Sequence, residues 1–265
     1  MTRSMQWLHD YGWRGIVGFI SPPHGSVDHL EFLRIAPEGY AVVQTMTYGS
    51  NFEVRSDLVA PLISQLGDCA KALREARSDV VAQSGTPFSF ASEGGLAFSL
   101  DLQKKIEDDI QVPYVMMGLA LINALKASGY ETVAVACTSY PDEIKEKYTS
   151  FLEAAGLRVM AMENWVDQGI FESPAVFKKV HTGRRLPMGY TFEAAKRVAK
   201  SAPTADCIVI SGGGVPTLDL LQPLEEDVGI PVISSLSGMF WEIFTKLGAP
   251  VIEGRGTLLG SLSRS

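Results

Sequence analysis

Short apolar stretches rich in β-branched residues alternate with amphipathic segments along almost the whole chain of 265 residues. Segments such as Leu58–Leu73 place apolar side chains at the spacing of a helix, and another helix is predicted from Pro141, with Pro141 in its first turn and Ser139 as its cap. Buried strands that alternate with helices are typical of parallel sheets covered on both faces, so the sequence predicts an α/β fold. The predicted strands are Gly15–Ser21, Tyr40–Thr47, Asp79–Ser84, Val112–Met116, Thr132–Cys137, Leu157–Met162, Cys207–Ser211 and Pro231–Ser234.

Two parts of the chain resemble each other. Ser78–Pro87 (SDVVAQSGTP) and Ala205–Gly214 (ADCIVISGGG) each contain a predicted strand followed by Ser-Gly. A second similar pair, Val112–Val115 and Ile230–Ile233, follows further along at a comparable offset. Any two strand–helix units of an α/β protein share some likeness, which is one explanation. We favour the other, two homologous lobes facing each other across a cleft, because ligands of such sheets bind beyond the carboxyl ends of the strands.

The charge balance and apolar content restrict the class of protein. The chain has 23 Lys and Arg against 30 Asp and Glu, a net charge of −7. Nucleic-acid binding needs a basic surface, so no nucleic-acid partner is expected. The most apolar stretch, Val115–Leu125, is shorter than the roughly 20 residues that span a bilayer, and no membrane association is expected.

The cysteines indicate a reducing compartment. Cys69, Cys137 and Cys207 have no metal-binding spacing, and the first residues do not resemble a secretory leader. An odd number of cysteines in such a chain is typical of reduced thiols in a cytoplasmic protein. The sequence therefore predicts cytoplasmic localisation, and it is compatible with a homo-oligomer.

Both Ser-Gly segments, Ser84–Thr86 and Ser211–Gly214, lie between a strand and a helix. Backbone N–H groups in such a turn, together with the helix N-terminus, favour an anion such as a carboxylate or a phosphate. The second segment lacks the third glycine of a dinucleotide fingerprint, and no P-loop lysine follows it. The alternative is a tight turn that needs glycine for its backbone alone.

Two further side chains follow predicted strands. Tyr140 can donate a hydrogen bond to an anion, or it is an ordinary half-buried aromatic residue. His24 follows the first strand, and the alternative for it is a solvated loop histidine. The four histidines lack the spacing of metal ligands, and the sequence contains no Gly-x-Ser-x-Gly nucleophile turn.

Taken together, these motifs resemble the aspartate/glutamate racemase superfamily, in particular its arylmalonate decarboxylase and maleate cis–trans isomerase branch. The resemblance rests on GIVG leading to Pro-Pro, SGTPFSF, ACTSY, ISGGG with TLD, and IPVISS, and it extends over roughly Gly15–Gly256. It implies two pseudo-symmetric lobes, each with a parallel four-stranded sheet, and an active site in the cleft between them. Residues 1–118 with 237–265 would form the first lobe, and 119–236 the second.

The resemblance also implies a mechanism without a metal or an organic cofactor. A small carboxylate substrate would become an enediolate held by hydroxyls and backbone N–H groups of both loops. Pro87 stands where the family has a further hydroxyl. The expected catalytic residues are Thr86, Tyr140 and His24, and the expected substrate-binding residues are Gly85, Pro87, Ser211, Gly212, Gly213 and Gly214.

The chain departs from the family at its reactive thiols. The positions that match the two family cysteines are Gly85 and Gly212. Three functions stay open: a lyase acting on a malonate-type carboxylate, with water, His24 or Tyr140 handling the proton; an isomerase or hydrolase of a small dicarboxylate; and a carboxylate-binding protein without catalysis. In the first, Phe88, Phe90 and Met46 would form an apolar seat for the departing carboxylate, or they are equally core residues. The stretch Phe171–Tyr190 is better explained as a solvated basic turn than as a lid whose Arg184 or Arg185 contacts a second carboxylate.

Overall fold

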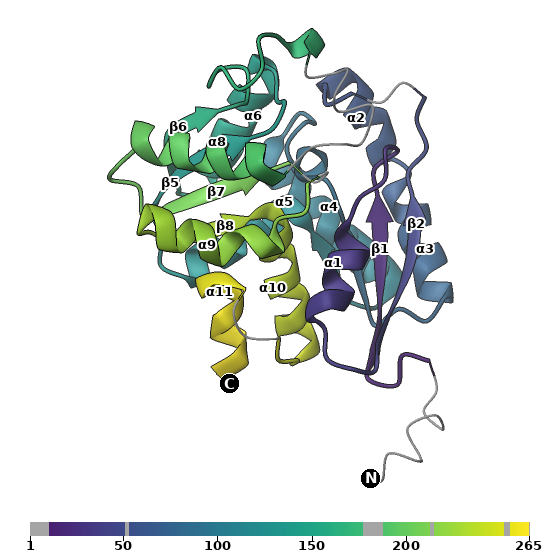
Figure 1. Ribbon diagram of the computed structural model, residues 1–265. Coiled ribbons are helices and arrows are strands. Elements are labelled where there is room, and N and C mark those ends of the chain that lie inside the picture. The colour runs from purple at the N-terminus through teal and green to yellow at the C-terminus, as the bar shows by residue number, and fades with distance from the viewer. Residues whose placement is uncertain (1–10, 51–52, 177–187, 213–214, 252–254, 265) are drawn as a thin grey trace.

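The protein is described by a computed structural model, which covers residues 11–50, 53–176, 188–212, 215–251 and 255–264 (Figure 1). Its strands form two parallel four-stranded sheets with the orders β2-β1-β3-β4 and β6-β5-β7-β8. The same order in both sheets confirms the predicted α/β fold with two pseudo-symmetric halves. The strands are β1 (Gly15–Ser21), β2 (Tyr40–Met46), β3 (Val80–Gln83), β4 (Tyr114–Met116), β5 (Thr132–Cys137), β6 (Arg158–Glu163), β7 (Cys207–Ser211) and β8 (Val232–Ser234).

Helices connect the strands and cover both faces of each sheet. In Figure 1, α8 and α9 lie beside the second sheet, whereas α1 lies beside β1 of the first. The α-helices are α1 (Asp28–Ile35), α2 (Ser56–Ile63), α3 (Leu66–Glu75), α4 (Gly95–Ile110), α5 (Met117–Ala127), α6 (Asp142–Ala154), α8 (Met188–Ser201), α9 (Leu218–Val228), α10 (Ser235–Leu247) and α11 (Gly256–Gly260). The described residues also contain the 3₁₀ helices η2 (Thr86–Ser89) and η3 (Ser261–Arg264).

The strand side chains alternate between two apolar layers. In β7, Ile208 and Ile210 pack in the layer that contains α8 and α9. Cys207 and Val209 pack in the layer that contains α5 and α6. Both faces of the strand are therefore buried, which explains why the sequence is apolar throughout rather than alternating.

The apolar layers continue from one half of the molecule into the other. Phe32 of α1 stacks on Phe244 of α10 with ring centroids 5.0 Å apart, and α10 packs against strands of both sheets. The helices α5 and α10 approach closely at Gly238, where a Cβ would lie 3.0 Å from the Cα of Leu121. The two halves thus share one core.

Two local predictions are wrong. The segment Leu58–Leu73 forms two helices, α2 and α3, because the hydrogen bonding changes at Ser64 and Gln65: the Gln65 N–H group donates to the Leu62 carbonyl, three residues back, over 3.1 Å. Pro141, rather than Ser139, is the N-cap of α6, and its side chain makes no capping hydrogen bond. The helix therefore begins at Asp142, one residue after the predicted start at Pro141. Proline is well suited to the start of a helix, where its missing N–H group is not needed.

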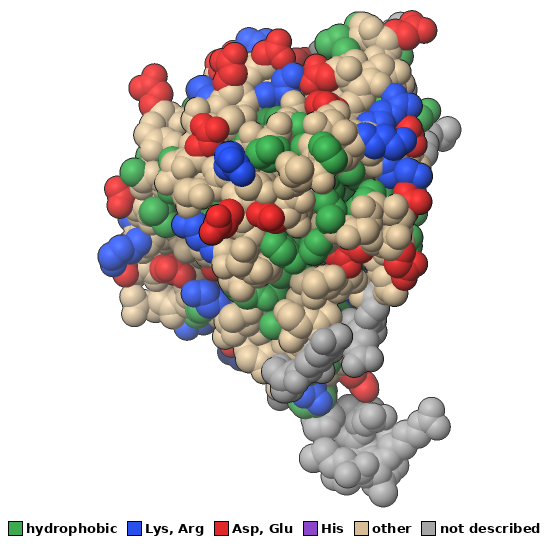
Figure 2. Space-filling view, turned by 90° about the vertical axis from the view of Figure 1, so that its left-hand side faces the viewer, with side chains coloured by type: hydrophobic (Ala, Val, Ile, Leu, Met, Phe, Trp, Pro, Cys, Tyr) green, Lys and Arg blue, Asp and Glu red, His purple; other side chains and the backbone are tan. Residues whose placement is uncertain are grey.

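The predicted lobe boundaries, 1–118 with 237–265 and 119–236, stay a prediction. None of the described helices is long and apolar enough to cross a membrane. On the face shown in Figure 2, basic side chains are interspersed with acidic ones. The stretch Phe171–Tyr190 is described only in part: Phe171 is buried and stacks on Trp165 with centroids 5.6 Å apart, and Arg184 and Arg185 lie outside the described residues.

Candidate active site

Four hydroxyl side chains meet where strands of both sheets end, and we call them the hydroxyl cluster: Thr86, Tyr140, Ser211 and Ser235. Thr86 begins η2 after β3, Ser211 ends β7, and Ser235 begins α10 directly after β8. Thr86 Oγ1 donates to Ser235 Oγ over 3.0 Å, and Ser235 Oγ donates to Ser211 Oγ over 3.4 Å. The Tyr140 hydroxyl lies 3.2 Å from Ser211 Oγ. The structure thus brings together three predicted site residues and adds Ser235.

The hydroxyl cluster is buried. None of its four residues exposes more than 2% of its surface. Burial raises the pKa of Tyr140 above its usual range, and the hydrogen bond with Ser211 acts in the opposite direction. The phenol therefore keeps its proton at neutral pH and can donate a hydrogen bond.

Tyr148 of α6 is a further candidate that sequence reasoning missed. Its ring stacks on Phe90 with centroids 4.6 Å apart and lies edge-on to Tyr140 at 6.1 Å. The hydroxyls of Tyr148 and Ser84 are buried without a hydrogen-bond partner among the described residues. An unpaired buried hydroxyl is costly, so both are candidate partners for polar atoms of a ligand. A serine directly after a strand was a usable signal for Ser235; no comparable signal marked Tyr148.

Gly85 adopts a backbone conformation that favours glycine, with φ of +98°. Its N–H lies 3.3 Å from Sδ of Met117, the first residue of α5. The position that matches Met117 in the second half is Ser235, since each is the first helical residue after the fourth strand of its sheet. The Gly85 N–H group therefore donates its hydrogen bond to the Met117 sulfur in this structure.

Gly212 is confined by Thr138. Its φ is +139°, and a Cβ at this position would lie 2.6 Å from Oγ1 and 2.8 Å from Cγ2 of Thr138. The backbone N–H of Thr138 in turn donates to the Ser211 carbonyl over 3.2 Å. A cysteine cannot replace Gly212 unless Thr138 moves. Gly213 and Gly214 lie outside the described residues.

The other predicted site residues have different positions. Pro87 is buried in η2 and offers no N–H. His24 lies after β1 with Nδ1 2.7 Å from the Gly25 carbonyl oxygen, and the hydrogen bonds within the hydroxyl cluster do not include it. Phe88 and Phe90 are buried, whereas Met46 is 51% exposed at the end of an edge strand and is not a core residue.

The three thiols are free, and none belongs to the hydroxyl cluster. Cys137 and Cys207 are buried within β5 and β7. Burial raises the pKa of Cys137 to about 12 and also raises the pKa of Cys207. Both thiols stay protonated and are poor nucleophiles at neutral pH.

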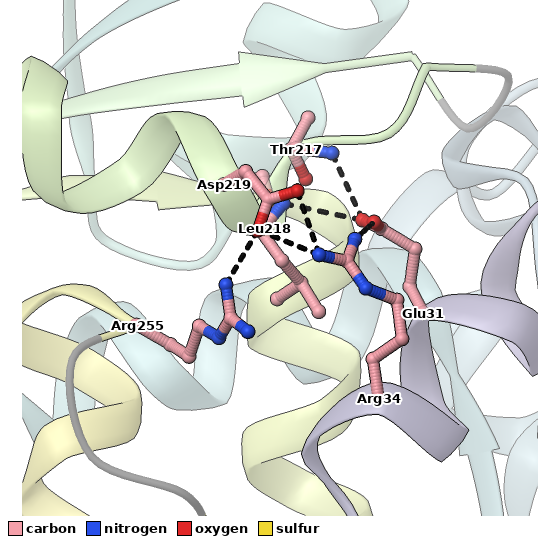
Figure 3. Close-up of polar contacts among 7 residues, drawn as sticks. Glu31, Arg34, Thr217, Leu218, Asp219 and Arg255 are labelled. Atoms are coloured by element: carbon pink, nitrogen blue, oxygen red, sulfur yellow. Dashed lines mark hydrogen bonds and ion pairs between the residues drawn. The ribbon is translucent and has the colours of Figure 1, made fainter.

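The N-terminus of α9 is already occupied by a carboxylate of the protein. Glu31 Oε2 accepts hydrogen bonds from the backbone N–H groups of Thr217 and Leu218 at 3.0 and 3.1 Å (Figure 3). The first N–H groups of α9 therefore bind a carboxylate of the protein itself, and the predicted site for a ligand anion stays a prediction.

A family model described as arylmalonate decarboxylase matches residues 18–259. The chain belongs to the arylmalonate decarboxylase family. It is 29% identical to the arylmalonate decarboxylase of Bordetella bronchiseptica over 226 residues, covering 85% of this chain and 88% of that protein. It is 26% identical to a maleate isomerase of Geobacillus stearothermophilus, covering 72% of this chain and 73% of the relative.

The solved structures agree with this family. The structure of unliganded arylmalonate decarboxylase superposes with a TM-score of 0.78 at 26% identity, covering 93% of this chain and 99% of that one. Because the relatives are decarboxylases and isomerases, the chain is an enzyme, a lyase or an isomerase.

Proposed function

We propose that this enzyme is a cofactor-independent lyase that decarboxylates a malonate or a related small carboxylate. The observation that supports the proposal is the hydroxyl cluster, in which Thr86 from one sheet is hydrogen-bonded to Ser235 from the other. Donors that are fixed in place and shielded from water stabilise developing negative charge strongly. A carboxylate that becomes an enediolate develops such charge on its oxygens.

In the first step the bond between the central carbon and one carboxylate breaks. Carbon dioxide leaves, and the electron pair of that bond remains on the substrate as the enediolate. Tyr140 donates a hydrogen bond to one enediolate oxygen, and the Thr86 hydroxyl turns from Ser235 to donate to the other. The buried rings of Phe88 and Phe90 offer an apolar surface that disfavours the charged carboxylate relative to neutral carbon dioxide.

In the second step a proton joins the carbon of the enediolate. We assign this proton to Tyr140, whose raised pKa keeps the phenol protonated. The phenolate regains a proton from the hydroxyl of Ser211, 3.2 Å away, and that hydroxyl is reprotonated by solvent when the product leaves. This route replaces the thiol that the family resemblance leads one to expect at position 212, where the chain has glycine.

The proposal is tested by incubating the enzyme with aryl- and alkylmalonates and measuring release of carbon dioxide. In D₂O the product should carry one deuterium at the new C–H position. Alkylation with iodoacetamide should leave the rate unchanged, because no thiol takes part. Turnover of maleate to fumarate without carbon dioxide would support the isomerase alternative instead. Binding of the malonates without any turnover would overturn the proposal.

A further inference from the structure

A second set of polar contacts joins the two halves of the molecule, away from the hydroxyl cluster. Figure 3 shows Glu31 and Arg34 of α1 pointing toward the first residues of α9. Glu31 is 3% exposed, although it is a charged residue on a short helix. A buried carboxylate is found where it has specific partners, and its partners here belong to the other sheet's half of the chain.

Glu31 supplies the cap that α9 lacks. The N-cap residue of this helix, Thr217, makes no capping hydrogen bond with its own side chain. Glu31 Oε2 instead accepts from the N–H groups of Thr217 and Leu218, and Oε1 accepts from Arg34 over 2.9 Å. A carboxylate at a helix N-terminus also interacts favourably with the helix dipole.

Arginines on both sides complete the contact. Arg34 donates to both carboxylate oxygens of Asp219, at 2.8 and 2.7 Å, and Arg255 donates to the same carboxylate. The hydrogen bonds from Arg34, followed by those from Arg255, hold the pKa of Asp219 below its usual range. The guanidinium groups of Arg34 and Arg255 thus balance the negative charges of Glu31 and Asp219.

Thr217, whose N–H group donates to Glu31, is connected to the hydroxyl cluster through Ser234. Thr217 Oγ1 donates to Ser234 Oγ over 2.8 Å. Ser234 forms a reciprocal capping box with Ser237 at the start of α10, with both N–H···Oγ distances at 2.9 Å. Ser235 directly follows Ser234 in the chain, and its hydroxyl is hydrogen-bonded to those of both Thr86 and Ser211. A continuous series of hydrogen bonds therefore runs from Glu31 to the backbone that carries Ser235.

We propose that Glu31 is a positioning residue for the reaction: it holds the start of α9 and, through Thr217 and Ser234, the Ser235 hydroxyl in register with Thr86. The expected effect of Glu31 on turnover depends on the proposed function. Because Glu31 belongs to α1, beside the first sheet, it fixes one half of the site relative to the other. Misplacement of a reacting group by about 1 Å can cost about 100-fold in rate.

The experiment compares Glu31→Gln, Glu31→Ala and Glu193→Ala. Glu193 is a suitable control because its carboxylate is exposed and accepts from Arg197 one turn further along the same helix, α8. Glutamine at position 31 keeps one acceptor oxygen for the two amides, but its NH₂ group cannot accept from Arg34. Kinetics with phenylmalonate and amide hydrogen exchange of residues 217–220 and 232–237 are measured for each variant.

We expect kcat to fall about 10-fold for Glu31→Gln and about 100-fold for Glu31→Ala, with KM changed less than about threefold. Amides in both segments should exchange faster, in the same order of variants. Glu193→Ala should match the unsubstituted protein. If Glu31→Ala does not fold, the comparison of Glu31→Gln with the unsubstituted protein tests the inference by itself.

Unchanged exchange at residues 232–237 in Glu31→Gln overturns the inference, because the path from Glu31 to Ser235 then carries no restraint. Faster exchange with unchanged kcat overturns it as well. If the unsubstituted protein releases no carbon dioxide from any malonate, the proposed function fails. The exchange data still decide whether Glu31 positions Ser235.

Discussion

The Thr86 hydroxyl donates a hydrogen bond to the hydroxyl of Ser235, a residue 149 positions further along the chain. One hydroxyl follows a strand of the first sheet and the other follows a strand of the second. Any shift of one half relative to the other changes their 3.0 Å separation. The chemistry proposed above therefore depends on how rigidly the halves are joined.

Replacing Tyr140 with phenylalanine should lower kcat/KM with phenylmalonate by at least about 100-fold, because the loss of one donor to a developing oxyanion costs that much and the variant also lacks the proposed proton donor. The melting temperature should change little, because Ser211 keeps its contact with Ser235. Tyr114→Phe is the matched control: Tyr114 is also fully buried, and its hydroxyl has no partner among the described residues. Equal rates for both variants and the unsubstituted protein would show that Tyr140 takes no part.

Introducing a thiol at position 212 should need a second change. Gly212→Cys alone is expected to cost about 1–3 kcal/mol of stability, because its Cβ meets the Thr138 side chain and its backbone has positive φ. Adding Thr138→Ala removes the two closest atoms and should restore part of that stability. Denaturant unfolding measures both effects. Arylmalonate decarboxylation should be faster in the double variant than in Thr138→Ala; no gain would argue against position 212 as a proton-donor site.

The contribution of Asp28 to the stability of the protein should fall as pH rises from about 4 to about 7. Neither of its carboxylate oxygens has a hydrogen-bond partner among the described residues. Burial raises its pKa from 3.8 to about 7, with nearby Ser26 opposing and the Glu31 charge adding to the shift. Between these values the folded state holds a proton that the unfolded chain has released, so this contribution is complete below about pH 4 and is lost up to about pH 7.

Asp28→Asn removes this ionisation. The variant should be more stable than the unsubstituted protein at pH 8, by at most about 4 kcal/mol, and the difference should shrink toward pH 4. Thermal unfolding at pH 4, 6 and 8 measures the trend. A difference that does not vary with pH would show that Asp28 keeps an ordinary pKa.

The contact between α5 and α10 should tolerate no side chain at Gly238. Gly238→Ala is expected to destabilise the protein by about 1–3 kcal/mol, because its Cβ would lie 3.0 Å from backbone of Leu121. Gly67→Ala in α3 is the matched control, since a Cβ there meets nothing within 4 Å. Alanine favours helix over glycine, so Gly67→Ala should stabilise by about 0.5–1 kcal/mol. Denaturant unfolding of both variants measures the difference.

The strands were predictable because burial on both faces leaves a plain apolar signature. The bounds of Gly15–Ser21, Thr132–Cys137 and Cys207–Ser211 agree with the structure. The division of Leu58–Leu73 into two helices was not predictable, because its apolar spacing continues across the break at Ser64. Periodicity reports the buried face of a segment, not where its backbone hydrogen bonds stop.

The site was predictable in part for a related reason. Hydroxyl-bearing residues at or just beyond strand ends indicated Thr86, Tyr140 and Ser211, because strand ends meet at one edge of a parallel sheet. Glu31 could not be found in this way. A glutamate on a helix is typical of a solvated face, and only the tertiary fold brings it to Thr217, 186 residues away.

Met117 and Ser235 occupy matching positions, yet one offers sulfur to the Gly85 amide and the other a hydroxyl to Thr86. In a symmetric pair of identical half-length chains, both positions would carry the same side chain. Joining the halves in a single chain lets them diverge. A malonate has two chemically identical carboxylates, and an asymmetric pocket is what allows an enzyme to keep one and release the other, and so to fix the stereochemistry of its product.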